Sequence, residues 1–136
     1  MKSKAAVLYK AGQPFEVCEV DVQPPKAGEV LVEIVAAGVC HTDYSVKTGQ
    51  LAAPLPAILG HEGAGVVREV GEGVTTVQPG DHVIALWRLA CGDCEYCDAS
   101  RPALCAAGTE IRASGRLQDG TSRFSRAGRE IKHFAG

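Results

Sequence analysis

Four cysteines within a stretch of fifteen residues are well suited to hold a metal ion. Cys91, Cys94, Cys97 and Cys105 follow the pattern C-x2-C-x2-C-x7-C. Reduced thiolates at this spacing suit the tetrahedral sulfur shell of zinc, in which each zinc–sulfur bond measures about 2.3 Å. An iron–sulfur cluster is the main alternative, but the last gap of seven residues departs from the C-x3-C-P ending of bacterial ferredoxins. Free or disulfide-bonded cysteines are the other alternative, and we predict a structural zinc site.

A second group of reactive side chains lies where expected strands meet loops. It comprises Cys40, His41, Thr42, Asp43, His61 and Glu62. Cysteine, histidine and carboxylate are all zinc ligands, although a buried histidine beside a glutamate is more often structural. The group lacks the two-histidine motif of helical metalloproteases, because Gly65 stands where the second histidine would be. The nearby glycines also do not form a dinucleotide-binding loop, because a strand rather than a helix is expected there.

The composition indicates a single soluble domain. The chain has 136 residues, 46% of them apolar and 22% charged, with a net charge of −2. This length allows one core, and the balance excludes wholesale disorder. No apolar run approaches the roughly 20 residues of a membrane span. No secretory signal follows Met1, so we expect a cytoplasmic protein with reduced thiols.

Alternating apolar residues, proline and glycine predict a small β barrel with one short helix. Strands are expected at 4–9, 15–22, 29–36, 63–70 and 82–87. A helix capped by Thr42 or Asp43 should end at Gly49, and 51–59 should form a proline-broken loop. Residues 109–136 are expected to form a hairpin-rich tail around Asp119-Gly120 and Ala127-Gly128.

Two further features require a choice between a structural and a functional interpretation. In the strand at 15–22, Phe15 and Val17 are expected on the buried face, with a slip near Cys18, which we interpret as a small core residue.

Residues 101–136 carry 7 basic and 3 acidic side chains. A nucleic-acid patch would give this charge, but few aromatic residues are interleaved to stack on bases, so we favour a solvated arginine-rich hairpin.

The motifs resemble those of the zinc-containing alcohol dehydrogenases. Gly60-His61-Glu62-x2-Gly65-x5-Gly71-x2-Val74 fits the family pattern at each fixed position, and the four-cysteine loop has the spacing of the family's structural-zinc lobe. Val39-Cys40-His41-Thr42-Asp43 is similar to the catalytic-cysteine segment, and Pro79-Gly80-Asp81-His82-Val83 to the turn and strand that follow. The chain most resembles the N-terminal, GroES-like catalytic domain of medium-chain dehydrogenases.

The resemblance implies a mainly β fold and a single domain. It implies a partly open, GroES-like β barrel over 1–136, with a short helix and a structural-zinc lobe at about 88–108. It also implies that the nicotinamide-binding Rossmann domain is absent from these residues. The complete protein would use zinc together with NAD or NADP, oxidise a small primary alcohol to an aldehyde, and form a homo-oligomer. It would bind neither nucleic acid nor membrane.

The resemblance also implies a role for each site residue. Cys40 and His61 would bind the catalytic zinc, which Glu62 could join during ligand exchange. Asp43 would accept a hydrogen bond from His61, and Thr42 would contact the substrate hydroxyl and pass its proton outward. The remaining assignments are His41 to the cofactor phosphates, Trp87 to the substrate pocket, and Cys91, Cys94, Cys97 and Cys105 to the structural zinc.

Two departures from the family pattern affect the expected activity. Ser45 stands where relay-type family members carry a histidine, so a proton could leave only through water or the cofactor ribose. The family's third catalytic-zinc ligand, a cysteine, falls beyond residue 136. We therefore expect these residues alone to be inactive, and a stand-alone, zinc-stabilised binding module is the alternative interpretation.

Overall fold

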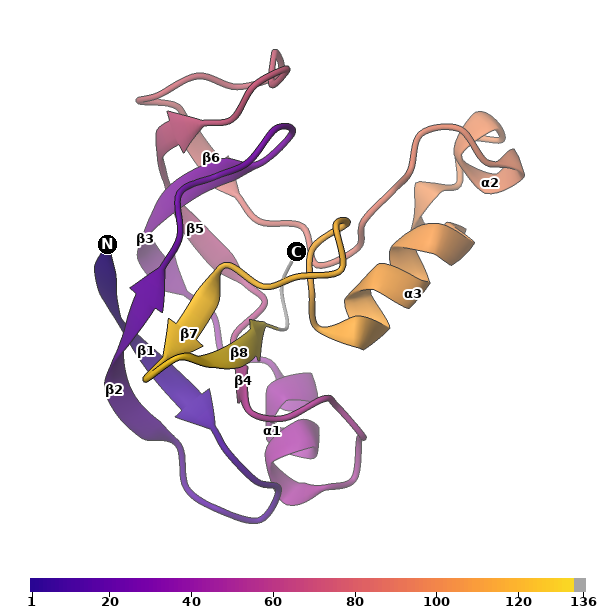
Figure 1. The fold of residues 1–136 in the computed structure, drawn as a ribbon. Coiled ribbons are helices and arrows are strands. Elements are labelled where there is room, and N and C mark those ends of the chain that lie inside the picture. The colour runs from indigo at the N-terminus through magenta and orange to yellow at the C-terminus, as the bar shows by residue number, and fades with distance from the viewer. Residues whose placement is uncertain (134–136) are drawn as a thin grey trace.

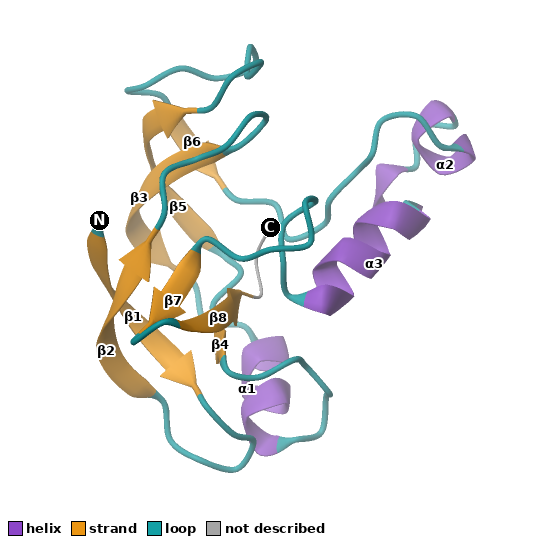
Figure 2. Cartoon of the chain, in the orientation of Figure 1, coloured by secondary structure: helices purple, strands orange, loops and turns teal. Residues whose placement is uncertain are grey.

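The strands form a closed barrel and a separate sheet in a computed structural model of the chain, which describes residues 1–133 (Figures 1 and 2). The barrel order is β1 (Lys2–Leu8), β2 (Glu16–Val22), β7 (Phe124–Arg126), β8 (Arg129–His133) and β4 (Ala57–Ile58). The antiparallel sheet has the order β3 (Val30–Ala37), β5 (Gly63–Val70) and β6 (His82–Ile84). The helical segments are α1 (His41–Thr48), α2 (Glu95–Asp98), a 3₁₀ turn at Pro102–Leu104, and α3 (Ala106–Ser114). The predicted small barrel with a short helix is confirmed.

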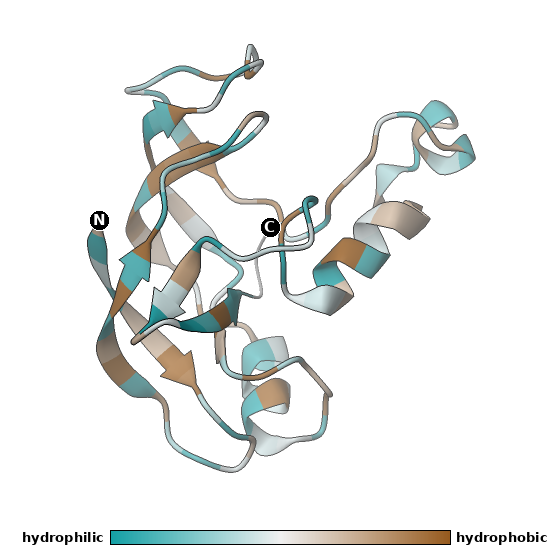
Figure 3. Cartoon of the chain, in the orientation of Figure 1, coloured by the Kyte–Doolittle hydropathy of each residue, from teal (hydrophilic) through white to brown (hydrophobic). Residues whose placement is uncertain are grey.

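The barrel core is built by alternation along β2 and by Val7 near the end of β1. Cys18, Val20 and Val22 point inward from β2 and pack with Val7 and Ile131. Figure 3 shows hydrophobic (brown) and hydrophilic (teal) segments mixed along the strands. The predicted burial of Val17 is wrong, because Val17 is 73% exposed whereas Cys18 is buried. Burial alternates regularly from Cys18 to Val22, so β2 contains no slip there. Cys18 is a small core residue, as expected.

Helix α1 is capped at both ends and packs against the barrel. Its N-cap is Cys40, whose sulfur accepts the N–H of Thr42, rather than the predicted Thr42 or Asp43. Gly49 ends the helix with a φ of 81°, a conformation that glycine adopts without strain. Val46 buries its side chain against Leu8 of β1. This packing fixes the position of Cys40 relative to the barrel.

Segments on both sides of β5 differ from the predicted loops, strands and hairpins. β6 ends at Ile84 rather than at residue 87, and the loop at 51–59 contains the short strand β4. The tail begins with helix α3 and includes one antiparallel hairpin, β7–β8, among the described residues. The predicted tail also includes 134–136, which lie outside the described residues. Within residues 1–133, no helix combines the length and apolar character needed to cross a bilayer.

The basic tail is tied to the rest of the chain by ion pairs. Arg123 is buried and donates two hydrogen bonds to Glu29, at 2.8 and 2.6 Å, and one to Asp119, at 2.7 Å. Lys26 also donates to Asp119, at 2.7 Å. Bidentate arginine–carboxylate pairs are among the stronger polar contacts in proteins. Arg123 therefore holds the turn at residues 26–29 against the tail, and it is a buried residue rather than part of a fully solvated hairpin.

This cluster predicts a loss of stability in acid. Hydrogen bonds, led by one from Lys26, hold the pKa of Asp119 far below its usual range. Partial burial opposes ionisation of Glu29, but hydrogen bonds from Arg123 outweigh it and lower the pKa of Glu29. Carboxylates with lowered pKa values stabilise the fold above their unfolded-state values, about 3.9 for Asp and 4.3 for Glu, and lose this contribution as the pH falls toward the folded-state values.

We therefore expect the melting temperature to fall progressively below about pH 5, and the loss should continue below pH 3, because the pKa of Asp119 lies far below its usual range. Thermal unfolding followed by circular dichroism across this range measures the effect. An Asp119→Asn variant should show a flatter pH profile, because one of the titrating groups is gone. Glu69→Gln, at an exposed position of β5, is the control and should leave the slope unchanged. Parallel slopes for Asp119→Asn and wild type would contradict the prediction.

Candidate metal centres

The four clustered cysteines converge to a geometry that suits a single metal ion. Their sulfur atoms all lie within 4.8 Å of one another. Individual sulfur–sulfur distances are 4.0 Å for Cys91–Cys97, 3.6 Å for Cys94–Cys97 and 3.5 Å for Cys105–Cys91. A tetrahedron with metal–sulfur bonds of about 2.3 Å has edges of roughly 3.8 Å. All four cysteines are free thiols, so the donor set fits zinc.

Short helical segments bring these cysteines together. Cys94 caps α2, Cys97 lies within it, and Cys105 caps α3. Cys105 is 1% exposed, and its sulfur accepts N–H groups from Gly108 at 3.3 Å and Cys91 at 3.4 Å. The approach requires glycine at 108, since a Cβ there would collide with the carbonyl of Leu89. Figure 1 shows this segment projecting from the strands.

Local hydrogen bonds shift the pKa values of two of the thiols in opposite directions. Backbone N–H donors, led by that of Gly108, favour the thiolate and lower the pKa of Cys105 to about 7. A hydrogen bond with Asp93 favours the protonated form and raises the pKa of Cys91 to about 12. Cys105 is therefore prepared as an anionic ligand before a metal arrives, whereas Cys91 must lose a proton when the metal binds.

The second group forms a smaller cluster at the start of β5. The ligand atoms of Cys40, His61 and Glu62 all lie within 4.8 Å of one another. Cys40 precedes α1, and the other two residues precede β5. A hydrogen bond of 2.9 Å from the Gly38 N–H to the Glu62 carbonyl joins the end of β3 to this turn. Sulfur, imidazole and carboxylate donors in one cluster also fit zinc.

Asp43 fixes the orientation of His61. Both of its carboxylate oxygens lie near Nδ1 of His61, at 3.3 and 3.2 Å, and one also accepts the Gly60 N–H at 3.0 Å. His61 and Asp43 are 5% and 8% exposed. A carboxylate at Nδ1 favours the tautomer with the proton on that atom, which leaves the Nε2 lone pair for a metal. This is the contact that the family resemblance implied.

Thr42 and His41 have different surroundings. The Thr42 hydroxyl is 3.4 Å from the sulfur of Cys40. His41 is exposed, and its Nδ1 lies 3.3 Å from the hydroxyl of Ser45, the residue that departs from the relay-type pattern. Thr42 therefore lies beside the candidate metal cluster, whereas His41 faces outward beside Ser45.

Trp87 is brought against the second cluster by the segment that follows β6. Its ring centroid lies 5.6 Å from that of His61. Two arginines that the sequence reasoning did not single out also lie over the indole, Arg88 at 4.7 Å and Arg112 at 5.1 Å. No sequence signal pointed to Arg112, because residues 109–136 were expected to form hairpins and not the helix that carries it.

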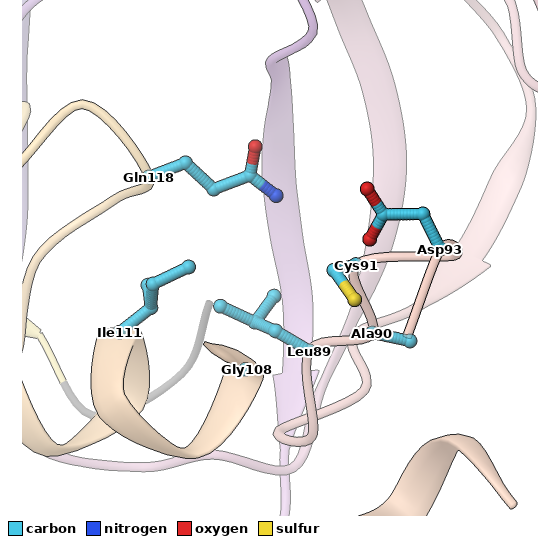
Figure 4. Close-up of a pocket in the computed structure, with 7 residues that line it drawn as sticks. All are labelled: Leu89, Ala90, Cys91, Asp93, Gly108, Ile111 and Gln118. Carbon is cyan, nitrogen blue, oxygen red and sulfur yellow. The ribbon is translucent and has the colours of Figure 1, made fainter. Parts of the chain in front are cut away.

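A cavity of about 200 Å³ lies beside the cysteine cluster rather than at the second centre. Leu89 and Ile111 supply aliphatic side chains, and Asp93 and Gln118 supply polar groups (Figure 4). Its lining also includes Cys91, Ala90 and Gly108. The cavity therefore adjoins the candidate structural centre, and the sequence reasoning did not anticipate it.

The fold and the two clusters agree with a comparison of the chain with protein families. Residues 26–126 match the alcohol dehydrogenase GroES-like domain family. The chain belongs to this family.

The chain is also similar to individual relatives and solved structures. The chain is 50% identical over 137 residues to an S-(hydroxymethyl)glutathione dehydrogenase of Escherichia coli O1:K1, covering 100% of this chain and 37% of that protein. Among solved structures, an alcohol dehydrogenase zinc-binding domain protein from Burkholderia ambifaria has a TM-score of 0.92 and 39% identity, covering 98% of this chain and 36% of that one. A benzyl alcohol dehydrogenase from Acinetobacter calcoaceticus has a TM-score of 0.88 and 35% identity, covering 98% and 35%.

These matches define what is shared. The chain spans little more than a third of the curated relatives it matches, 37% of their length. What it shares with them is the GroES-like catalytic domain of an oxidoreductase family, and the four-cysteine cluster supports zinc binding.

Proposed function

We propose that this chain is the catalytic-domain portion of a zinc-dependent alcohol dehydrogenase. Joined to a nicotinamide-binding Rossmann domain, it would oxidise a primary alcohol to an aldehyde by hydride transfer to NAD or NADP. The observation that carries the proposal is the cluster of Cys40, His61 and Glu62 with Asp43 behind the histidine. A purely structural centre would not require an exposed carboxylate and a neighbouring hydroxyl.

Each residue around this centre would have a separate role in the reaction. Zinc held by Cys40 and His61 would supply Lewis-acid chemistry at an alcohol oxygen. Asp43 would hold His61 in its ligating tautomer. Thr42 would hold the substrate hydroxyl and pass its proton toward solvent, while the hydride leaves for the nicotinamide. Glu62 would join the metal shell during ligand exchange.

Two exposed or partly exposed side chains would define the edges of the site. His41 would contact the cofactor phosphates, consistent with its outward position beside Ser45. Trp87 would line the substrate pocket, and its bulk beside His61 favours small alcohols. The other centre, in a lobe at about 88–108, would hold a structural zinc. We further propose a cytoplasmic, homo-oligomeric complete protein that binds neither nucleic acid nor membrane.

A chimeric enzyme tests this function. We define the extended protein as this chain joined to the remainder of the E. coli relative that it matches at 50% identity. NADH formation with primary alcohols should be undetectable for the chain alone and clear for the extended protein. The catalytic interpretation would be wrong if the extended protein folded, bound NAD and gave no turnover. Turnover by the chain alone would overturn the expectation that these residues are inactive by themselves.

A further inference from the structure

Gly38 lies directly opposite Glu62 at the end of the pairing between β3 and β5. The last paired residues of this ladder are Ala37 and Gly63. The register continues for one more step, where the Gly38 N–H donates to the Glu62 carbonyl at 2.9 Å. Side chains of directly opposite residues in an antiparallel pair lie on the same face and contact each other. Glycine at 38 therefore leaves the position across from Glu62 without a side chain.

The Glu62 side chain occupies the space that a side chain at 38 would take. A Cβ at residue 38 would collide with Oε2 of Glu62, and it would lie 3.0 Å from Cβ and 3.1 Å from Cδ of the same residue. The φ angle of Gly38 lies outside the left-handed region, unlike that of Gly60 at 104°. The backbone conformation therefore does not require glycine at 38. The requirement comes from the close approach of Glu62.

The Glu62 carboxylate has no polar partner among residues 1–133 that would hold it in place. The residue is exposed, and its carboxylate makes no hydrogen bond or ion pair within the described chain. One of its oxygens nevertheless lies within 4.8 Å of the ligand atoms of Cys40 and His61. Its approach to this cluster depends on which rotamers the neighbouring backbone leaves open, and the bare backbone at Gly38 leaves this one open.

We propose that Gly38 is a positioning residue for Glu62: because it carries no side chain, the carboxylate can reach a metal ion held by Cys40 and His61. Glu62 then enters the metal shell beside one sulfur and one imidazole nitrogen. With a methyl group at 38, the exposed Glu62 side chain would rotate away from the cluster and the fold would remain. This inference rests on the proposed function, in which these residues hold the catalytic zinc.

A purely structural role for Gly38 makes different predictions. The residue directly follows β3, and its only role would then be to let the chain pass close to the turn before β5. A methyl group at 38 would lower the melting temperature, but it would not change the affinity of the cluster for a metal ion. Metal affinity in a double-mutant cycle with Glu62 separates the two roles, because residues that act together give non-additive effects.

Cobalt(II) binding measures the effect of Gly38 without relying on turnover. The chain is first loaded with one equivalent of zinc to fill the four-cysteine cluster, and it is then titrated with cobalt(II). A sulfur-to-cobalt absorption band that disappears in Cys40→Ser identifies metal at Cys40. We expect Gly38→Ala to weaken this binding by about 10–100-fold, the range typical of residues that orient a metal ligand. The melting temperature of the zinc-loaded chain should stay close to that of wild type.

Further variants assign the effect to Glu62. Glu62→Ala should weaken cobalt binding by a similar factor, and Gly38→Ala/Glu62→Ala should bind no more weakly than Glu62→Ala, because the colliding carboxylate is gone. Gly63→Ala is the matched control, since a Cβ there would lie 3.1 Å from Cδ1 of Ile34 and not against Glu62, and it should keep the wild-type affinity.

Several results would overturn the proposal. These are additive losses in the double variant, equal losses in Gly38→Ala and Gly63→Ala, and an unchanged affinity in Gly38→Ala or Glu62→Ala. A Gly38→Ala chain that does not fold by circular dichroism would overturn it as well, since the exposed Glu62 side chain is expected to give way.

The titration also separates this inference from the proposed function. Cobalt binding at Cys40 that does not depend on Gly38 would contradict the inference alone. A wild-type chain without a Cys40-dependent cobalt band would also overturn the inference, whereas the proposed function is judged by the turnover of the extended protein. An extended protein that binds NAD without turnover contradicts the proposed function, and the cobalt cycle on the chain still decides the role of Gly38.

Discussion

The purified chain is expected to hold about one tightly bound zinc, and the double variant Cys94→Ser/Cys97→Ser is expected to lose it. Four sulfurs within 4.8 Å of one another form a complete, local shell. Apparent binding free energies for such structural sites in zinc-finger peptides are about 10–16 kcal/mol at neutral pH. Serine oxygens are much poorer ligands, so removal of two thiolates should eliminate tight binding. Atomic emission spectroscopy after dialysis against a chelator measures the zinc content.

Loss of the zinc should change the fold only near the cysteine cluster. Residues 88–108 contribute one fully buried side chain, Cys105, and the barrel core lies elsewhere. We therefore expect the segment between β6 and α3 to become sensitive to protease, while the β-strand circular dichroism signal persists. Cys18→Ala is the matched control, because it removes a core cysteine without touching the cluster, and it should retain the zinc. A well-folded wild-type chain that is isolated without metal would contradict the structural-zinc prediction.

His61→Ala is expected to reduce the turnover of the extended protein by about 10³-fold or more. Lewis-acid stabilisation by a metal is worth several kcal/mol, and each 1.36 kcal/mol corresponds to about a factor of ten in rate. His61 is 5% exposed and held by Asp43, so a water molecule cannot reproduce its position. Steady-state NADH formation gives the rate, and cobalt absorption of the metal-exchanged protein reports on sulfur and imidazole ligation.

Two further variants make the result specific. His82→Ala removes an exposed histidine from β6 and should keep the turnover of the extended protein. Asp43→Asn should give an intermediate loss of about 10–100-fold, the usual effect of removing the hydrogen-bond partner of a ligating histidine. A His61→Ala protein with near-normal turnover would show that this cluster is not the catalytic centre.

Sequence reasoning succeeded where the information is local. The spacing of Cys91, Cys94, Cys97 and Cys105 predicted a cluster that the structure brings together. Strand β5 was predicted with the bounds that the structure shows, because its run of valine and glycine is bounded by clear turns. Gly49 ends α1 as predicted, since a left-handed residue at that position favours glycine.

The predictions failed where tertiary contacts override local patterns. Helix α3 was expected to be part of a hairpin-rich tail, but its N-cap is Cys105, whose sulfur is held by the N–H of Cys91 from the preceding loop. In β2, the pattern alone could not decide which face is buried, and packing with Val7 and Ile131 buries Cys18 rather than Val17.

The ligand types, their spacing and the small β architecture could be predicted from the sequence, because short-range geometry and strand alternation depend on neighbouring residues. Which distant side chains meet depends instead on the tertiary packing. It turns Arg112 of α3 toward Trp87, and it brings Asp43 against His61, a contact that the family resemblance had implied but no local pattern had. It also pairs Arg123 of the basic tail with Glu29. These contacts depend on how the barrel, α1 and α3 pack, and packing is a property of the whole chain that no local pattern records.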